Sequence, residues 1–448
     1  MNLKLIFISL GLLLTELLTA QDQTTELSLK QVIEIARMES PDAQTARHSF
    51  RSAYWNYKYY RANYLPSLSL TSDPNLNRAI NKITMGDGSV KFVEQNLLNT
   101  DLTLNLSQNL SWTGGSFFLE TSAQRMDLFS EHKYSWQTSP IMIGYRQSLF
   151  GYNSLKWDRR IEPVRYQEAK KSYVETLELV SANAIHKFFA LATAQSDYDI
   201  ASFNYANADT LYRYAQGRYN IGTITENEML QLELNRLTEE TNRMNALIEM
   251  DNCMQELRSY LGIHEDRELR VLVSPQIPDF SVNLNEALAL AYENSPDIQT
   301  MERRKLESES AVAKARANAG LKADIYLRFG LTQTADKLPE AYRNLLDQQY
   351  VSIGISLPIL DWGRGKGQVR VARSNRDLVY TQVEQSRTDF ELNVRKLVKQ
   401  FNLQTQRVRI AARTDETAQR RSEVARKLYL LGKSTILDLN ASISEKDS

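Results

Sequence analysis

The stretch LSLKQVIEIARMESPDAQT, residues 27–45, decides the fold because the chain uses it twice. It returns as VNLNEALALAYENSPDIQT at residues 282–300, an offset of 255. Further along, the matching positions lie 210 apart: Gly144 and Gly354, Tyr219 and Tyr429, Gly222 and Gly432, Thr225 and Thr435. Two halves therefore repeat one pattern. The drop from 255 to 210 means 45 extra residues in the first half, between Asn63 and Gly144.

Each half predicts a short helix, a longer helix, strands, a very long helix, a tight turn and a returning helix. The Ser-Pro-Asp triplets end the short helix and begin the next one. Glycine-free residues 154–216 carry apolar side chains at coiled-coil spacing, and so do residues 366–431. The two stripes are Tyr173, Leu177, Val180, Ala184, Phe188, Leu191 and Tyr198, and Val383, Phe390, Val394, Leu397, Phe401 and Val408.

At 1.5 Å per residue, each of these two helices would be about 95 to 100 Å long. Outside the narrow apolar stripes the helices are rich in charged and amide side chains. That composition suits a hollow bundle with water on two faces of each helix. An ordinary solvent-exposed coiled coil is the alternative, and it would explain the helices alone.

Between the helices the sequence period changes to two. In residues 101–112 the apolar Leu102, Leu104, Leu106, Leu110 and Trp112 alternate with polar residues, and residues 141–146, 324–331 and 351–357 repeat the pattern. Lipid outside and water inside a transmembrane barrel would explain this alternation. A soluble sandwich with one buried face would explain it too. Aromatic residues near the strand ends favour the barrel, as an interfacial girdle: Tyr64, Trp112, Trp136, Tyr152 and Trp362.

The 45 extra residues coincide with a long turn around Asp73-Pro74 and residues 85–88, followed by a hairpin. The arms of this hairpin are residues 101–112 and 116–124, joined at 113–115. The sequence leaves open whether the hairpin joins the barrel wall or projects outside the cell. About four strands cannot close a channel-sized barrel, so several chains must contribute to it.

Residues 1–20 have the features of a secretory signal peptide: Lys4, an apolar stretch from Leu5 to Leu18, and small residues before Gln21. An uncleaved N-terminal anchor is the alternative. No later segment contains 18 consecutive apolar residues, so membrane insertion would have to use strands.

Composition excludes several classes of protein. The 448 residues carry 54 Lys+Arg and 54 Asp+Glu, which argues against a polybasic nucleic-acid surface. With 42% hydrophobic and 24% charged residues, wholesale disorder and a polytopic helical membrane protein are excluded. Cys253 is alone, and the four histidines show no metal-ligand spacing. Residues 363–367 lack the spacing of a phosphate loop. We therefore expect no cofactor, no metal and no enzyme activity.

With these features assembled, the chain resembles the TolC-type outer membrane efflux family over essentially its whole length after the signal. The resemblance rests on the two repeated openings at Leu27 and Val282, the Ser-Pro-Asp helix starts, and the strand-to-helix corners 147–153 and 357–363. The turns Tyr219–Gly222 and Tyr429–Gly432 complete it. No single motif decides it, but their order, found twice, is specific.

The resemblance implies a mainly α fold with β. Long coiled-coil helices would form a periplasmic α-barrel, and the strands would contribute to a transmembrane β-barrel shared by a homotrimer. Such a duct exports solutes or proteins in a tripartite efflux or type I secretion system. Its partners would be a periplasmic adaptor (membrane fusion protein), an inner-membrane transporter of RND, ABC or MFS type, and outer membrane lipid. A periplasmic coiled-coil adaptor or scaffold is the alternative.

The expected segments follow the repeat. After the signal come first-half N-terminal helices (21–63), a β region with the extra hairpin (64–150), and a long helix, tip turn and returning helix (151–280). The second half has N-terminal helices (281–319), a β-hairpin (320–362), and a long helix, tip turn and shortened returning helix (363–448). Because that last helix ends 24 residues before the counterpart of Gly262, we expect a further amphipathic helix in the gene product.

By family position, the turns beside the long helices form the periplasmic tip, where a closed channel narrows and the adaptor docks. Tyr429 matches the constriction tyrosine, and Glu228 and Asp438 occupy acidic tip positions. The usual arginine partner is replaced by Ser434, and a second acidic position by Ala441. A closed state held by an arginine link is therefore not expected. Glu228 and Asp438 could equally serve their helix N-termini, while Gly222 and Gly432 are predicted turn glycines.

Overall fold

The computed structural model describes residues 25–129, 131–264, 268–274, 280–431 and 433–447, so the predicted signal at 1–20 lies outside it. The fold combines helices and strands, which confirms the predicted class. The helices are α2 (Leu29–Glu39), α3 (Pro41–Ala62), α4 (Ser154–Asn220), α5 (Glu226–Leu261), α6 (Leu284–Asn294), α7 (Pro296–Ala319), α8 (Arg364–Asn402), α9 (Gln404–Leu430) and α10 (Ile436–Asp447), with a short 3-10 helix η1 (Glu340–Tyr342). The strands are β1 (Thr25–Ser28), β2 (Ser67–Thr71), β3 (Asn75–Thr84), β4 (Val90–Asn109), β5 (Ser116–Leu128), β6 (Lys133–Leu149), β7 (Leu269–Leu272), β8 (Lys322–Ala335) and β9 (Leu346–Ser356).

The helix bounds repeat at both offsets found in the sequence. Adding 255 to the bounds of α2, 29 and 39, gives 284 and 294, the bounds of α6. Adding 210 to the bounds of α4, 154 and 220, gives 364 and 430, the start of α8 and the end of α9. The predicted long helix at 366–431 is nevertheless wrong in one respect, because it is interrupted at Leu403 whereas α4 is continuous.

The Ser-Pro-Asp triplets act as the sequence predicts. Ser40 accepts a hydrogen bond from the amide of Ala43, and Pro41 begins α3. In the second half Ser295 is the N-cap of α7 and accepts from the amide of Asp297. The serine side chain satisfies an amide of the first turn, and proline has no amide to satisfy at that position.

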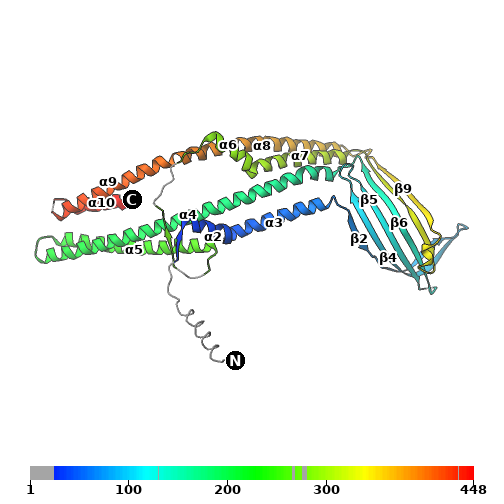
Figure 1. Ribbon diagram of the computed structural model, residues 1–448, viewed down its shortest axis with the longest axis horizontal. Coiled ribbons are helices and arrows are strands. Elements are labelled where there is room, and N and C mark those ends of the chain that lie inside the picture. Colours follow the sequence, from blue (N-terminus) through cyan, green and yellow to red (C-terminus); the bar gives the residue numbers. More distant parts are fainter. Residues whose placement is uncertain (1–24, 130, 265–267, 275–279, 432, 448) are drawn as a thin grey trace, which may run out of the picture. The chain divides into compact units, whose positions relative to one another are not determined.

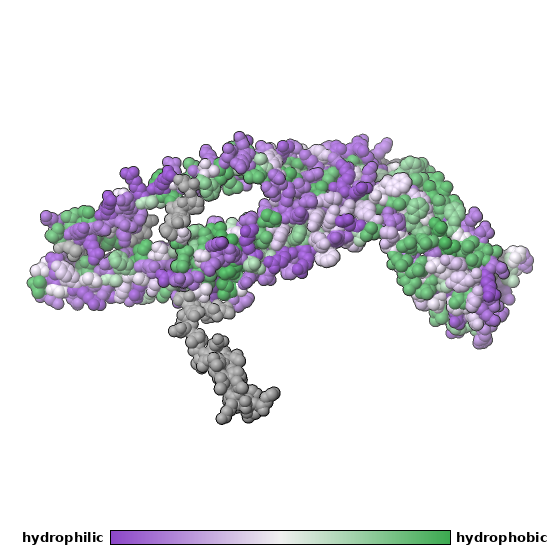
Figure 2. Space-filling view, in the orientation of Figure 1, coloured by the Kyte–Doolittle hydropathy of each residue, from purple (hydrophilic) through white to green (hydrophobic). Residues whose placement is uncertain are grey.

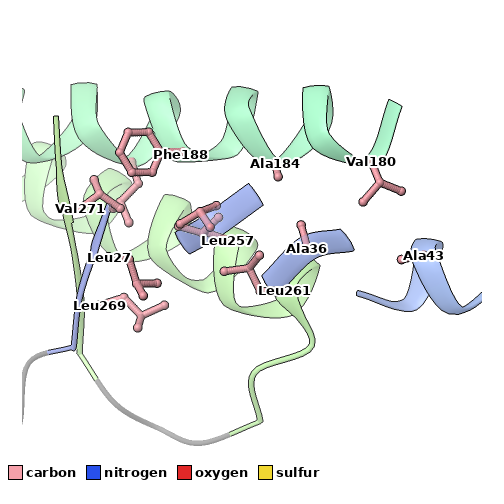
Figure 3. Close-up of a cluster of buried hydrophobic side chains, with 12 residues drawn as sticks. Leu27, Ala36, Ala43, Val180, Ala184, Phe188, Leu257, Leu261, Leu269 and Val271 are labelled. Carbon is pink, nitrogen blue, oxygen red and sulfur yellow. The ribbon is translucent and has the colours of Figure 1, made fainter. Parts of the chain in front are cut away.

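Contacts divide the chain into two compact units. The helical unit comprises the described parts of Met1–Phe50, Ser172–Asn294 and Glu391–Ser448; the sheet unit comprises Arg51–Lys171 and Ser295–Phe390. The core of the helical unit joins one face of α4 to the end of α5, to α2 and to the strand pair β1–β7 (Figure 3). Its largest buried side chains include Phe188, Leu191, Leu257 and Leu261.

The parallel pair of β1 with β7 was not predicted. Leu27 lies opposite Val271, and both side chains enter the core of the helical unit. The four residues of β1 come directly before α2, whose capping box is formed by Ser28 and Gln31. The sequence there begins a helix pattern, and only a partner about 240 residues away turns its first residues into a strand.

The sheet unit holds a seven-stranded antiparallel sheet in the order β2-β4-β5-β6-β8-β9, with β3 also pairing with β4 (Figure 1). Ser67 of β2 lies opposite Ser107, and Asn75 of β3 lies opposite Asn99, in one common register on β4. β2 and β3 are therefore one column of the sheet, interrupted at residues 72–74, where Pro74 cannot donate to the ladder.

The expected hairpin is present as β4 and β5, and it lies within the sheet. Its arms differ slightly from the prediction, because β4 begins earlier, at Val90, and ends at Asn109. Leu110 and Trp112 thus belong to the turn that leads to Gly114, whose φ is +79°. The long turn predicted around Asp73-Pro74 and residues 85–88 is wrong in extent, because residues 75–84 between them form β3. The turn between β3 and β4 is a tight one, closed by the amide of Gly88 donating to the carbonyl of Met85.

Across the described residues, none of the helices is both long enough and apolar enough to pass through a membrane.

Candidate functional site

The sheet exposes its apolar face and packs its polar face, which is the reverse of the arrangement in a water-soluble protein. The apolar side chains are the exposed ones: Ile143 is 54% and Ile353 63% exposed, while Met142 on the polar face is fully buried. The same exposed face continues over four more strands through Leu68, Leu70, Leu102, Leu104, Leu106, Phe117, Leu119, Ile141, Phe329, Val351 and Ile355. Figure 2 shows hydrophobic residues gathered over the strands. A soluble sandwich would bury this face, so that alternative is not supported.

The polar face is closely packed by its own side chains. Glu120 of β5 accepts a 3.2 Å hydrogen bond from Arg328 of β8, across β6. The ring of Phe118 lies on Gly144, where a Cβ would come within 2.0 Å of it, so only glycine leaves room for the ring. Arg146 stacks on the ring of Tyr326 at 5.5 Å. This face therefore carries charge and hydrogen-bonding groups suited to water.

The aromatic residues predicted as a girdle separate into two groups. Trp112 and Trp362 are 79% and 90% exposed, beside the ends of the strands. Trp136 packs against the guanidinium of Arg125. Tyr64 and Tyr152 instead point into the sheet unit.

Both of these tyrosines use their hydroxyl groups for internal contacts. Tyr64 donates to the carbonyl of Leu155, and Tyr152 shares a hydrogen bond with Ser310. They fasten strand-to-helix corners, and their place in an interfacial girdle stays a prediction.

The sheet has two open edges. The β2–β3 column ends it on one side and β9 ends it on the other. The backbone of an edge strand presents unpaired amides and carbonyls, and these favour pairing with another strand. β2 runs away from the helices and β9 runs back toward them, so the two edges have the antiparallel sense needed to pair with each other in neighbouring copies.

The first tip turn joins α4 to α5 in the helical unit. Gly222 has φ of +73°, and its amide donates to the carbonyl of Tyr219, as predicted for a turn glycine. Thr225 caps α5 and accepts from the amide of Glu228. The carboxylate of Glu228 in turn accepts from the amide of Thr225 at 3.0 Å. Glu228 therefore completes a capping box, which gives it a structural role in its helix.

The second tip turn repeats this arrangement before α10. The carboxylate of Asp438 accepts from the hydroxyl of Thr435 at 2.7 Å and from Ser434 at 3.3 Å. These bonds, first of all the one from the Thr435 side chain, lower the pKa of Asp438 below its usual range. Ser434 thus has a partner within its own turn. The predicted turn glycine Gly432 lies outside the described residues.

Tyr429 faces the first tip turn from the second hairpin. Burial raises the pKa of its hydroxyl; the positive charge of Arg218 opposes this rise, and Glu228 and Tyr214 add to it. The charge of Glu228 therefore acts on Tyr429, and the role of both at an aperture stays a prediction. Arg218 was not predicted, because the resemblance places the arginine partner at position 434, on the same hairpin as Tyr429. The available signal was a cation four residues before the turn glycine Gly222, directly before Tyr219.

Within the described ranges, no three His, Cys, Asp or Glu side chains are placed to hold a metal ion. The arrangement that is present consists of a sheet with one apolar and one polar face, and of long helices ending in capped turns.

The model of the outer membrane efflux protein family matches residues 287–444, from α6 into α10. The second half of the chain is thus similar to an outer membrane efflux protein domain. Solved channels share its fold and that of the first half. The Campylobacter jejuni outer membrane channel CmeC matches with a TM-score of 0.67 at 16% identity, over 94% of this chain and 80% of that one.

The Vibrio cholerae outer membrane protein VceC matches with a TM-score of 0.65 at 14% identity, over 94% of this chain and 90% of that one. A search of curated proteins finds no significant match. The resemblance to the outer membrane efflux family, predicted from the repeat, is confirmed.

Proposed function

We propose that the chain is the outer membrane export duct of a tripartite efflux or type I secretion system. The observation that carries this proposal is the inverted burial of the sheet, whose apolar side chains are exposed while its polar ones are packed. An exposed apolar surface across six strands would promote aggregation in water, but it fits the hydrocarbon of a bilayer. The efflux protein domain of the second half supports the same conclusion.

In this proposal three copies share one transmembrane β-barrel. A single sheet with two open edges leaves backbone groups that hydrocarbon cannot satisfy, and closure removes both edges. Antiparallel pairing of β9 with the β2–β3 column of the next copy provides that closure. The polar face, with Glu120, Arg328 and Arg146, then lines the water-filled lumen.

The helical part lies in the periplasm and forms the tunnel, with the tip turns at its inner end. Tyr429, Glu228 and Asp438 narrow the closed aperture there, with Ser434 in place of an arginine. The two tip turns meet a periplasmic adaptor, which links the duct to an inner-membrane transporter of RND, ABC or MFS type. Energy and cargo selection come from that transporter, and the duct has no enzymatic turnover.

Reconstitution of the full chain tests the proposal. Protein extracted from outer membranes should migrate as a trimer in native mass measurements and should conduct ions across a planar bilayer. Trp112→Ala serves as a control variant, because that side chain lies in a turn and lines no lumen in the proposed barrel. A monomer that partitions into the aqueous phase without detergent and passes no current would favour the alternative, a periplasmic adaptor or scaffold, and would refute the duct.

A further inference from the structure

The first half of the chain builds more of the sheet than the second half does. Subtracting 255 from the first residue of β8, 322, gives 67, where β2 begins. Subtracting 210 from the bounds of β9, 346 and 356, gives 136 and 146, which lie inside β6. The β2–β3 column and β6 are therefore the counterparts of β8 and β9. Strands β4 and β5 have no counterpart in the second half, and they account for the 45 extra residues.

The extra hairpin is fully part of the wall. β4 pairs with the β2–β3 column on one side and with β5 on the other, and β5 pairs with β6 from Ser116 to Leu128 with one bulge. The ion pair between Glu120 and Arg328 ties β5 to β8 across the intervening strand.

Its two faces are in phase with the rest of the sheet. Leu104 and Leu119 are exposed with the other apolar residues, while Asn105 and Glu120 lie with the polar ones. A hairpin folded outside the wall would have no reason to keep this alternation.

We infer that the duct has a barrel of eighteen strands, six from each of three copies, and that the β4–β5 hairpin widens its exit. This inference rests on the proposed function. Without the hairpin, each copy would contribute four strands and the barrel would have twelve. The number of strands per copy comes from the sheet itself, whatever cargo the duct carries.

The difference in width follows from strand geometry. Strands about 4.8 Å apart and tilted by about 40° each occupy about 6.3 Å of circumference. Eighteen strands then give a backbone diameter of about 36 Å, and twelve give about 24 Å. Removing a side-chain layer of roughly 5 Å from each wall leaves an open width of about 26 Å against about 14 Å.

This width decides the class of cargo that the exit admits. A single helix with side chains is about 10 to 12 Å across, so a twelve-stranded exit passes one helix and an eighteen-stranded exit passes two packed helices. The exit is thus suited to bulky solutes and to polypeptides that retain packed secondary structure. Selection among smaller solutes has to occur elsewhere in the duct.

Electron cryomicroscopy of the wild-type trimer in lipid nanodiscs tests the inference directly. The expected cross-section has eighteen strands, with β4 and β5 between the β2–β3 column and β6. A twelve-stranded ring with the hairpin outside the wall would overturn it and leave the proposed duct intact. A preparation with no membrane-embedded trimer would overturn the duct, and this inference with it.

A deletion gives an independent measurement. Replacing residues 85–132 by Asn-Gly joins the β2–β3 column directly to β6, and replacing residues 85–89 by Asn-Gly is the control that keeps all six columns. Polyethylene glycols of graded size report the open width of the barrel exit. They are added on the side of the planar bilayer that faces away from the helices. We expect the largest polymer that enters to be about twofold wider for wild type and control than for the deletion variant. Equal cut-offs in all three proteins would refute the wider exit, and if the deletion variant does not assemble, a wild-type cut-off near 14 Å would do so.

Discussion

Apolar side chains are buried in the helical unit and exposed on the sheet, although both regions are equally regular. Phe188 and Leu257 are at most 1% exposed, whereas Ile353 and Ile355 are 63% and 72% exposed. The first pair belongs to the core that joins α4 to the end of α5. The second pair alternates with Ser352 and Gly354 on a single strand. The contrast teaches that the two regions are built for different solvents: one excludes water by its own packing, and the other requires an apolar medium supplied from outside.

Truncation of the helical core should give the largest effect. Phe188→Ala removes a ring that contacts the end of α5 and the β1–β7 pair, and we expect a loss of about 3 to 5 kcal/mol in unfolding free energy. Phe189→Ala is the matched control, because its neighbouring ring is 43% exposed and should cost less than about 1 kcal/mol. Hydrogen exchange of α4 and α5 measures both. Equal losses for the two variants would mean that the core does not lie on this face of α4.

A charged substitution on the exposed face of the sheet should show whether that face contacts lipid or water. At a water-exposed position Ile353→Lys would change stability by less than about 0.5 kcal/mol, but facing the bilayer midplane it should cost about 2 to 4 kcal/mol. Ser352→Lys, on the polar face of the same strand, is the control and should be tolerated. Urea unfolding from lipid vesicles measures the difference. Similar stabilities for the two lysine variants would remove the argument for a lipid-facing sheet.

A partly buried ion pair between α4 and α7 should give an intermediate effect. Glu168 accepts from Arg303 at 2.5 Å and from Thr300 at 2.8 Å, and both members of the pair are about one fifth exposed. Because Glu168→Gln removes one of the two carboxylates that the Arg303 guanidinium binds and leaves it only Glu307, we expect a loss of about 1 to 3 kcal/mol. Glu416→Gln is the control. It breaks an exposed pair with Arg420 on α9 and should cost less than about 0.5 kcal/mol.

The same pair predicts a pH dependence. Burial raises the pKa of Glu168, but the hydrogen bonds from Arg303 and Thr300 outweigh it and hold the pKa below its usual value of 4.5. A lowered pKa in the folded state stabilises the protein above pH 4.5, and this contribution is lost as the pH falls through the lowered value. Acid titration of unfolding should therefore show a steeper loss for wild type than for Glu168→Gln. Parallel curves would show that the pair does not couple to folding.

The sequence predicted what depends on nearby residues and missed what depends on distant ones. Helix starts at Ser-Pro-Asp, the long α4 and the alternation of the strands follow from spacing within a few residues, and they are correct. The β1–β7 pair and the place of the β4–β5 hairpin depend on partners that no local pattern names. The break at Leu403 was also missed, because the stripe of apolar residues continues through it.

The candidate site shows the same division. Gly222 could be placed from its turn, but the approach of Arg218 to Tyr429 joins two hairpins about 210 residues apart. The sequence left open whether Glu228 and Asp438 act at the aperture or stabilise the N-termini of their helices. Their hydrogen bonds to Thr225 and Thr435 support the helix-start role, and the aperture role remains part of the proposed function.

The smallest loss of stability is expected at the tip turns, where the capping side chains are exposed. Thr225→Ala removes the hydroxyl that accepts from the amide of Glu228, and it should cost about 1 kcal/mol, confined to the first turn of α5. Thr225→Ser keeps an accepting hydroxyl and should restore most of the loss. Hydrogen exchange at residues 226–229 resolves a local effect from a global one, since the core around Phe188 should keep its protection. Loss of protection throughout α5 would mean that the tip and the core unfold together, and the contrast between them would then hold only for burial and not for stability.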